Sequence, residues 1–153
     1  MARTYRSSRS RRIANSLIKA ALTAGLAPRS YVLVTTTGRR TGQARSTPVR
    51  PVTHREKRYL VAPYGAVPWV VNARADGTAT LSRGRDRQHV GLVECGPDEA
   101  GPVLKEYIRL VPITRPYFDA EVDDPVDRFI AESEHHPVFR IVDAPRGQST
   151  AGE

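Results

Sequence analysis

The sequence is short of the residues that hold small proteins together through covalent bonds or metals. Only one of its 153 residues is a cysteine, Cys95, so an internal disulfide and a cysteine-based zinc site are both excluded. A chain of about 150 residues can bury a sufficient apolar core without either. The composition therefore predicts a single domain and is compatible with a reducing cytoplasm.

Several common catalytic and nucleotide-binding motifs are also missing. No Gly-Lys-Ser/Thr follows Gly42, no G-x-G-x-x-G opens a helix, and no G-x-S-x-G nucleophile turn is present. The four histidines lack the i, i+4 spacing and the matched carboxylates of a helical metal site. Cys95 has no nearby base in the sequence and is expected to pack as a small side chain. We therefore predict no metal site and assign no catalytic side chain.

Long apolar runs are absent and acidic residues are outnumbered. No segment approaches the roughly twenty apolar residues of a membrane-spanning helix. Lysine and arginine total 24 against 16 acidic residues, for a net charge of +8 and a pI near 10.2, and 21 of the 24 are arginine. This excess favours acidic partners such as phosphorylated cofactors, anionic lipid or nucleic acid, and charge alone does not choose among them.

The N-terminus is the most basic part of the chain. Residues 1–12 carry five arginines among serines, and we expect this arm to be disordered or bound to a surface. Residues 13–26 predict an amphipathic helix whose apolar stripe packs on the core. The alternative is peripheral contact of residues 1–26 with an anionic membrane, which would place a cytoplasmic protein at its inner face.

A glycine- and arginine-rich turn lies between two extended segments, at residues 31–37 and 45–52, that are predicted to pair as strands. Gly38 and Gly42 permit backbone angles that would bring successive N–H groups toward one point. Arg39, Arg40 and Arg45 add planar donor forks suited to phosphate or carboxylate. The turn predicts a phosphate grip, and the alternative is an ordinary hairpin whose arginines face water.

The rest of the chain alternates short strands with a few helices. Further strands are predicted at residues 59–62, 78–82, 88–94 and 138–142, and helices are predicted to begin at Pro68, Asp98 and Asp124. Residues 112–124 form a loop with the length of a lid or pocket wall. We predict an α+β fold in which about six mainly antiparallel strands form a small closed or half-closed barrel. This domain would span residues 13–145, with a flexible tail at 146–153.

Two segments carry a resemblance to a known family. They are G-R-R-T-G-Q-x-R-x-T-P, from Gly38 to Pro48, and P-W-x-x-N-x-R-A, from Pro68 to Ala75. Together they resemble the deazaflavin-dependent nitroreductase family of actinobacterial split-barrel oxidoreductases, most strongly over residues 31–81. The resemblance implies a split β-barrel that uses coenzyme F-420, an 8-hydroxy-5-deazaflavin with a phosphate and a polyglutamate tail, in preference to FMN.

The same resemblance implies a cofactor site by matching positions. The residues expected to hold the phosphate and tail are Arg39, Arg40, Thr41, Gly42 and Arg45, with Thr47 and Pro48 flanking the groove. Those expected beside the deazaflavin ring are Pro63, Tyr64 and Gly65, with Pro68, Trp69, Asn72 and Arg74 closing the pocket. Candidates for the acceptor pocket are Tyr107, Tyr117 and Phe118, because aromatic side chains stack on planar rings.

The sequence thus predicts an F-420-dependent reductase that transfers a hydride to a small planar acceptor such as a quinone or nitroaromatic. A noncatalytic deazaflavin-binding or carrier protein is the first alternative. A basic nucleic-acid-binding barrel is the second and is disfavoured, because few aromatic residues lie near the basic turns to stack on bases.

Overall fold

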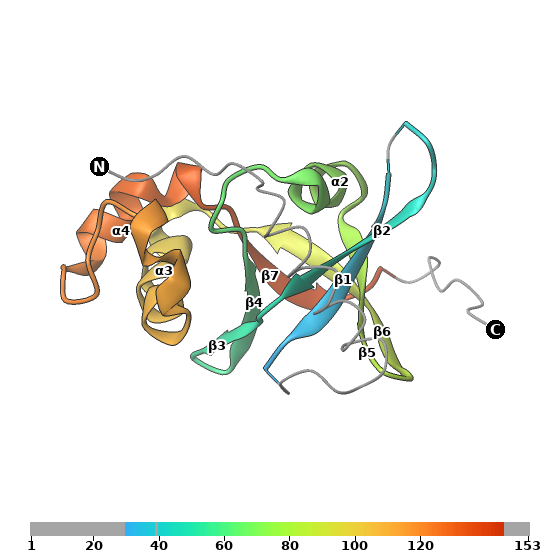
Figure 1. Cartoon of the computed structure of the whole chain (residues 1–153), viewed down its shortest axis with the longest axis horizontal. Helices are drawn as coiled ribbons and strands as arrows, with labels where there is room; N and C mark the ends of the chain where they lie inside the picture. The colour runs from blue at the N-terminus through green and yellow to red at the C-terminus, as the bar shows by residue number, and fades with distance from the viewer. Residues whose placement is uncertain (1–29, 39, 146–153) are drawn as a thin grey trace.

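The computed structural model describes residues 30–38 and 40–145, in which seven strands form one antiparallel sheet (Figure 1). The strands are β1 Val32–Thr37, β2 Ala44–Val49, β3 Val52–His54, β4 Lys57–Val61, β5 Thr78–Arg83, β6 Asp86–Glu94 and β7 Val138–Asp143. The α-helices are α2 Pro68–Asp76, α3 Pro97–Leu110 and α4 Val126–Glu132, and the 3-10 helices are η1 Pro112–Tyr117 and η2 Ser133–His135. The helix predicted at residues 13–26, the arm at 1–12 and the tail at 146–153 lie outside the described residues.

The order of the strands forces the sheet to curl. It runs β2-β1-β5-β6-β7-β4-β3, so β2 and β3 occupy opposite edges of the sheet although they are neighbours in sequence. Only Arg50 and Pro51 connect them. Two residues span less than about 8 Å, so the two edges must approach each other. The result is a half-barrel rather than a flat sheet.

Residues 45–52 were predicted as one strand, and this was wrong. Pro51 has no N–H to donate to a ladder and restricts Arg50 before it, so pairing with β1 ends at Val49. Val52 then begins β3, which pairs with β4. The described chain therefore has seven strands where about six were predicted.

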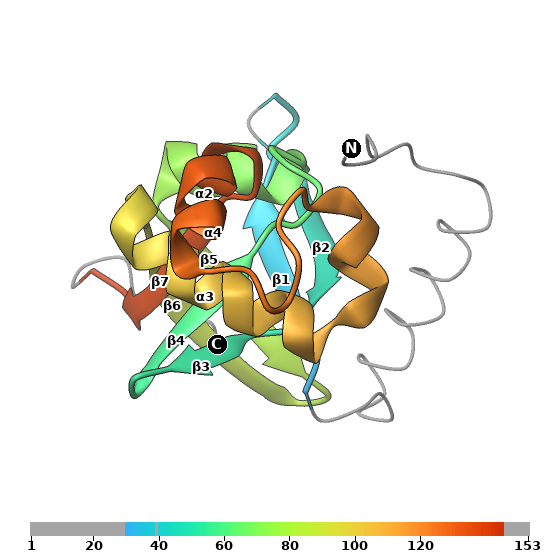
Figure 2. The same cartoon turned by 90° about the vertical axis from the view of Figure 1, so that its left-hand side faces the viewer.

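The core lies in two parts, one inside the barrel and one under the helices. Inside the barrel, Trp69 packs on Phe139 with ring centroids 5.6 Å apart, among aliphatic side chains of the strands. Outside it, α3 covers β4 and β7 and packs against α4, so Phe129 is fully buried. Figure 2 views the molecule from the side of α3 and α4. Both faces of the sheet are thus packed against apolar side chains, which fixes the positions of the groups at its rim.

Three predicted helix features differ in detail, one of them being α4, which begins at Val126 and not at Asp124. Helix α3 begins one residue before Asp98, with Gly96 at the N-cap, and Asp98 lies in the first turn with no side-chain cap bond. Pro97 at the first helical position takes the place of a side-chain cap because it needs no hydrogen bond there. The predicted loop at residues 112–124 contains η1.

The single cysteine provides a test of the packing between β6 and α3. Burial, followed by the nearby Glu99 carboxylate, raises the pKa of Cys95 to about 12. The thiolate is therefore rare at neutral pH, and we expect a disulfide reagent at pH 8 to modify Cys95 on the order of a hundredfold more slowly in the folded protein than in urea. Absorbance of the released thiolate measures both rates. Equal rates would mean that Cys95 is accessible and unperturbed.

Candidate functional site

Two adjoining cavities lie where α2 meets β2. The first, which we name the inner cavity, has a volume of about 430 Å³. The second, the outer groove, has a volume of about 520 Å³. Thr47, Pro68 and Trp69 line both, so the two cavities are continuous along the edge of β2. Each volume falls in the range of about 300 to 1,000 Å³ that is typical of cofactor and ligand sites.

The outer groove is polar, and its lining includes a positively charged side chain. Besides the shared residues it is lined by Leu33, Gln43, Ala44, Arg45 and Ser46. Arg45 is exposed, and the Ser46 hydroxyl lies 2.8 Å from that of Thr35. A guanidinium beside hydroxyl and amide groups is a donor set suited to phosphate or carboxylate oxygens.

The turn before β2 uses its backbone donors internally. Gly38 N–H donates to Gln43 O at 2.8 Å, Gly42 N–H donates to Gly38 O at 2.9 Å, and Gln43 N–H donates to the Thr41 hydroxyl at 3.3 Å. Gly42 has a φ of +69°, which closes this turn. The predicted convergence of N–H groups on a ligand is therefore not formed by these three donors. Side chains, above all Arg45 in the outer groove, are the donors that the structure places for an oxyanion.

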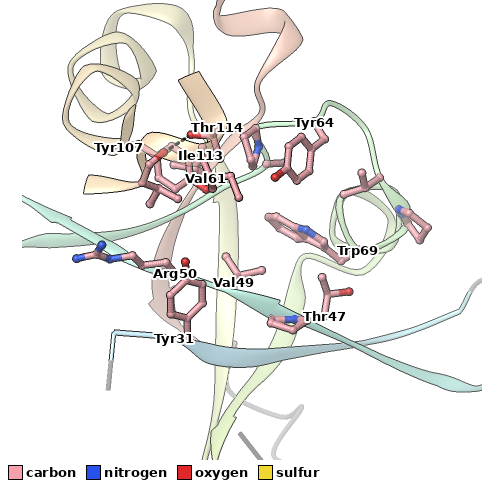
Figure 3. Close-up of a pocket in the computed structure, with 16 residues that line it drawn as sticks. Tyr31, Thr47, Val49, Arg50, Val61, Tyr64, Trp69, Tyr107, Ile113 and Thr114 are labelled. Carbon is pink, nitrogen blue, oxygen red and sulfur yellow. Dashed lines mark hydrogen bonds between the residues drawn. The ribbon is translucent and has the colours of Figure 1, made fainter. Parts of the chain in front are cut away.

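The inner cavity is mostly aromatic and aliphatic (Figure 3). Trp69 stands at one side, 4% exposed and fixed by its contact with Phe139. The Tyr64 ring is held edge-on to Tyr117, with centroids 4.8 Å apart. Aromatic walls of this kind favour a flat, apolar ring as ligand.

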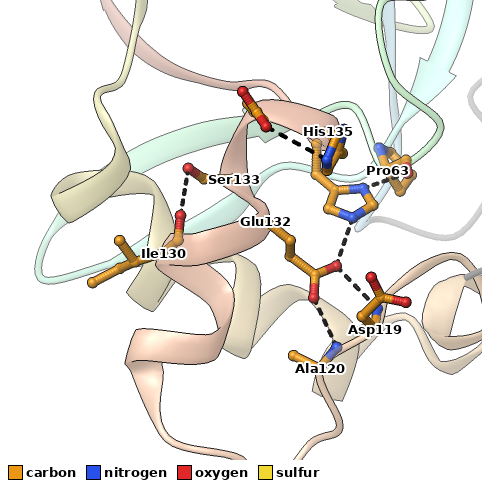
Figure 4. A network of polar contacts seen from close by, with 9 residues as sticks. Pro63, Asp119, Ala120, Ile130, Glu132, Ser133 and His135 are labelled. Atoms are coloured by element: carbon orange, nitrogen blue, oxygen red, sulfur yellow. Dashed lines mark hydrogen bonds and ion pairs between the residues drawn. The ribbon is translucent and has the colours of Figure 1, made fainter. Parts of the chain in front are cut away.

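A buried ion pair supports the wall of the inner cavity at Pro63 (Figure 4). His136 Nδ1 donates to the carbonyl of Pro63 at 2.8 Å, and Nε2 lies 2.8 Å from the Glu132 carboxylate. Glu132 also accepts the backbone N–H groups of Asp119 at 3.1 Å and Ala120 at 2.7 Å. The loop after β4 is thus tied to α4 through fully partnered groups, which keeps the wall rigid.

The far end of the inner cavity holds Tyr107 and Arg50. Tyr107 is 5% exposed, and burial, followed by the nearby Tyr64 and Tyr31, raises the pKa of its phenol. The phenol is therefore neutral and able to donate a hydrogen bond. Arg50 donates from Nη1 to the carbonyl of Leu110, the last residue of α3, at 2.8 Å.

The structure brings many of the predicted site residues together. The inner cavity is lined by Thr47, Pro48, Pro63, Tyr64, Pro68, Trp69 and Tyr107, and the outer groove by Arg45 with the shared Thr47, Pro68 and Trp69. These members of the predicted site therefore lie along two continuous cavities, although they come from β2, α2, α3 and the loop after β4.

Other predicted residues lie outside the lining of these two cavities. Asn72 is buried and donates to the Thr36 hydroxyl at 3.1 Å, and Arg74 forms two hydrogen bonds with Glu94, at 2.8 and 2.7 Å. Phe118 stacks on His136 with centroids 3.8 Å apart. The remaining ones are Arg40, Thr41 and Gly42 in the turn, Gly65 beside the cavity wall, and Tyr117 behind Tyr64. Arg39 lies outside the described residues.

Sequence reasoning missed several residues of the lining. Tyr31 and Arg50 line the inner cavity, and Gln43 and Ser46 line the outer groove. The hairpin pairs Val32 with Val49. Tyr31 directly precedes Val32 and Arg50 directly follows Val49, so the two residues lie at the same end of the hairpin. This register could have been derived from the turn at Gly38. Ile113 and Thr114 in η1 had no comparable signal.

Two absences hold for the described part of the chain. No group of three His, Cys, Asp or Glu side chains there is placed to hold a metal ion. No helix there is long and apolar enough to cross a membrane.

The seven-stranded curled sheet with a cavity at its rim is a split β-barrel of the FMN-binding type, which confirms the predicted fold class. Within that class, the chain belongs to the F420H(2)-dependent quinone reductase family, whose sequence profile matches residues 7–118. The match confirms the resemblance seen in the sequence and reaches well beyond residues 31–81. Comparison with curated proteins gives no significant match.

Solved structures share the fold at low identity. A chain described as an F420-H2 dependent reductase, FDR-A, is 24% identical over 74% of this chain and 94% of that one, with a TM-score of 0.50. A nimc/nima family protein from Clostridium acetobutylicum is 13% identical over 88% of each chain, with a TM-score of 0.51. At these identities the likeness supports the fold alone.

Proposed function

We propose that this protein binds coenzyme F-420 and is a reductase that passes a hydride to a small planar acceptor such as a quinone or nitroaromatic. The observation that carries the proposal is the pairing of a polar, arginine-bearing groove with an aromatic cavity, continuous at Thr47, Pro68 and Trp69. A ligand that joins a flat ring to an anionic tail fits that pairing. Membership of the F420H(2)-dependent quinone reductase family agrees with it.

The residues present match the two parts of such a cofactor. Arg45, with Ser46 and Gln43, would hold phosphate and tail carboxylates in the outer groove. Trp69, Tyr64 and the loop at Pro63 would enclose the ring in the inner cavity. The bound cofactor supplies the hydride, so the protein needs to supply placement and exclusion of water rather than an acid–base pair. Solvent at the open groove would deliver the proton.

The acceptor would occupy the end of the inner cavity formed by Tyr31, Tyr107 and η1. Tyr107 is suited to this role because its neutral phenol can donate a hydrogen bond to a ring oxygen. Rigid walls matter here, because hydride transfer requires the two rings at about 3 to 3.5 Å. The network from Pro63 to Glu132 would preserve that spacing.

Binding of F-420 and FMN by the purified protein tests the cofactor. We expect F-420 to bind more tightly, because its polyglutamate tail adds carboxylates that reach arginines which the single phosphate of FMN does not engage. Fluorescence titration of each cofactor measures the two dissociation constants. Equal or tighter binding of FMN would contradict the preference, and binding of neither would remove the cofactor proposal.

A second measurement separates a reductase from a carrier. With reduced F-420 bound, a reductase oxidises it when menadione or a nitroaromatic is added, and the absorbance of the oxidised cofactor returns. A protein that binds F-420 tightly and gives no acceptor-dependent oxidation with any such acceptor is a carrier. The aromatic end of the inner cavity, lined by Tyr31 and Tyr107, favours the reductase because it offers a place for a planar acceptor.

A further inference from the structure

Arg50 is an uncompensated charge in an otherwise neutral cavity. Among the described residues that line the inner cavity, it is the one charged side chain, and no carboxylate faces it there. It forms no salt bridge within the described part of the chain. A half-buried cation without a counter-ion is a group that a ligand anion can stabilise.

Within the described chain Arg50 makes one hydrogen bond, and this bond engages only part of its guanidinium. Nη1 donates to Leu110 O, which caps the C-terminal end of α3, while Arg115 Nε donates to Ile108 O at 2.8 Å nearby. A guanidinium has five N–H groups, so capping occupies one of them. The others remain for a ligand.

Tyr107 supplies a second donor in the same cavity. Its electrostatic neighbours include Arg50, Tyr31 and Tyr64, all of which line the inner cavity. Within the described residues the buried Tyr107 hydroxyl has no hydrogen-bond partner, and a buried polar group in that condition is stabilised by a ligand that accepts its hydrogen bond. Figure 3 shows Tyr107, Arg50 and Tyr31 across the cavity from Trp69 and Thr47, which adjoin the outer groove.

We propose that Arg50 and Tyr107 form a subsite for an acidic oxygen, so that the preferred acceptor is a planar ring bearing a carboxylate or an ionised hydroxyl group. The inference rests on the proposed function, because it assigns the acceptor to this end of the inner cavity. A guanidinium and a phenol can each donate a hydrogen bond to an acidic oxygen, whereas an uncharged, purely aliphatic substituent would accept from neither.

A pair of isosteric ligands tests the subsite without turnover. Naphthalene-2-carboxylate and naphthalene-2-carboxamide have the same shape and differ in charge, and calorimetric titration is made with and without oxidised F-420. We expect the wild-type protein to bind the carboxylate at least about tenfold more tightly. Arg50→Gln should weaken carboxylate binding about ten- to hundredfold and leave the amide within about twofold. Tyr107→Phe should weaken binding of the carboxylate about three- to tenfold.

Controls separate this subsite from the cofactor grip and from a capping role. Arg45→Gln, in the outer groove, should retain the preference for the carboxylate, and Arg50→Lys, which keeps the charge, should retain part of it. If Arg50→Gln does not fold, Arg50→Lys and Tyr107→Phe carry the test. A residue that only caps α3 would change the melting temperature and leave the ligand preference unchanged.

Several results would overturn the subsite. They are equal wild-type affinity for the two ligands, no binding of either, a preference that survives Arg50→Gln, or one that is lost in Arg45→Gln. A loss of F-420 affinity greater than about tenfold in Arg50→Gln would assign Arg50 to the cofactor instead. Failure of the wild-type protein to bind F-420 would refute the proposed function, whereas the two naphthalene ligands without cofactor still report on Arg50.

Discussion

Replacement of Arg45 by alanine is expected to weaken F-420 binding by about 1.5 to 3 kcal/mol, which is about ten- to 150-fold in the dissociation constant. Arg45 is the charged residue that lines the outer groove among those described. Its side chain is exposed and does not pack in the core, so we expect its removal to leave the fold intact. The expected loss is that of a charge-assisted hydrogen bond to a phosphate or carboxylate oxygen.

The measurement is a fluorescence titration of F-420 at low and moderate salt. Arg87→Ala is the matched control, because Arg87 is also an exposed arginine on a strand but lies on β6, outside both cavities. Arg40→Ala, in the turn beyond the groove, is expected to show a loss of the same order through the polyglutamate tail. Since exposed charges are screened, the effect of Arg45→Ala should shrink as salt rises.

Unchanged affinity in Arg45→Ala and Arg40→Ala, with the melting temperature preserved, would return the arginine turn to an ordinary solvated hairpin. An equal loss in Arg87→Ala would mean that the net charge of +8 attracts the cofactor without a defined grip.

The local parts of the fold were predictable from the sequence because their signals are local. The β-branched run of β1, the glycine turn after it and Pro68 at the first position of α2 each fix an element within a few residues. The cofactor residues expected from the resemblance are mostly on these elements. Their positions relative to one another follow from the hairpin register and from the short connection to α2.

The non-local parts were harder to predict, for a physical reason. The break at Pro51 sends the chain to the opposite edge of the sheet, and nothing in the sequence near β2 indicates which edge receives β3. The end of the inner cavity is lined by Tyr107 on α3 and Ile113 on η1, which meet β2 only through tertiary packing. Arg50 was therefore overlooked: it lay within the strand predicted at residues 45–52, whereas β2 ends at Val49, directly before it.

Trp69 shows why core and site could not be separated from sequence. Its ring packs on Phe139 inside the barrel and also lines both cavities. One tryptophan thus belongs to the core and to the candidate site. A pattern of apolar residues cannot distinguish these roles where the pocket wall is the core itself.

Replacement of Glu132 by alanine is expected to destabilise the protein by about 3 to 5 kcal/mol, the usual cost of removing one partner of a buried ion pair. Glu132 is 7% exposed and its two oxygens accept from His136, Asp119 N–H and Ala120 N–H. Alanine leaves the His136 ring nitrogen and the Ala120 N–H buried without this acceptor, and it also removes the acceptor of the Asp119 N–H.

Urea unfolding followed by circular dichroism measures the effect as a shift of the midpoint at constant slope. Glu134→Ala is the matched control, because Glu134 lies two residues away with its side chain 81% exposed, and it is expected to cost less than about 0.5 kcal/mol. Glu132→Gln should fall between the two, since its amide keeps one acceptor oxygen but turns an N–H₂ group toward another donor.

Glu132→Ala should also affect the wall of the inner cavity, because His136 connects Glu132 to the carbonyl of Pro63. With Glu132 removed, the loop from Pro63 to Tyr64 loses its fixed anchor, and the folded fraction of the variant should bind F-420 more weakly than wild type. Titration in mild conditions, where the variant remains folded, separates this loss from unfolding. A Glu132→Ala protein within about 1 kcal/mol of wild-type stability would show that water or another acceptor replaces the carboxylate, and that the wall at Pro63 does not depend on it.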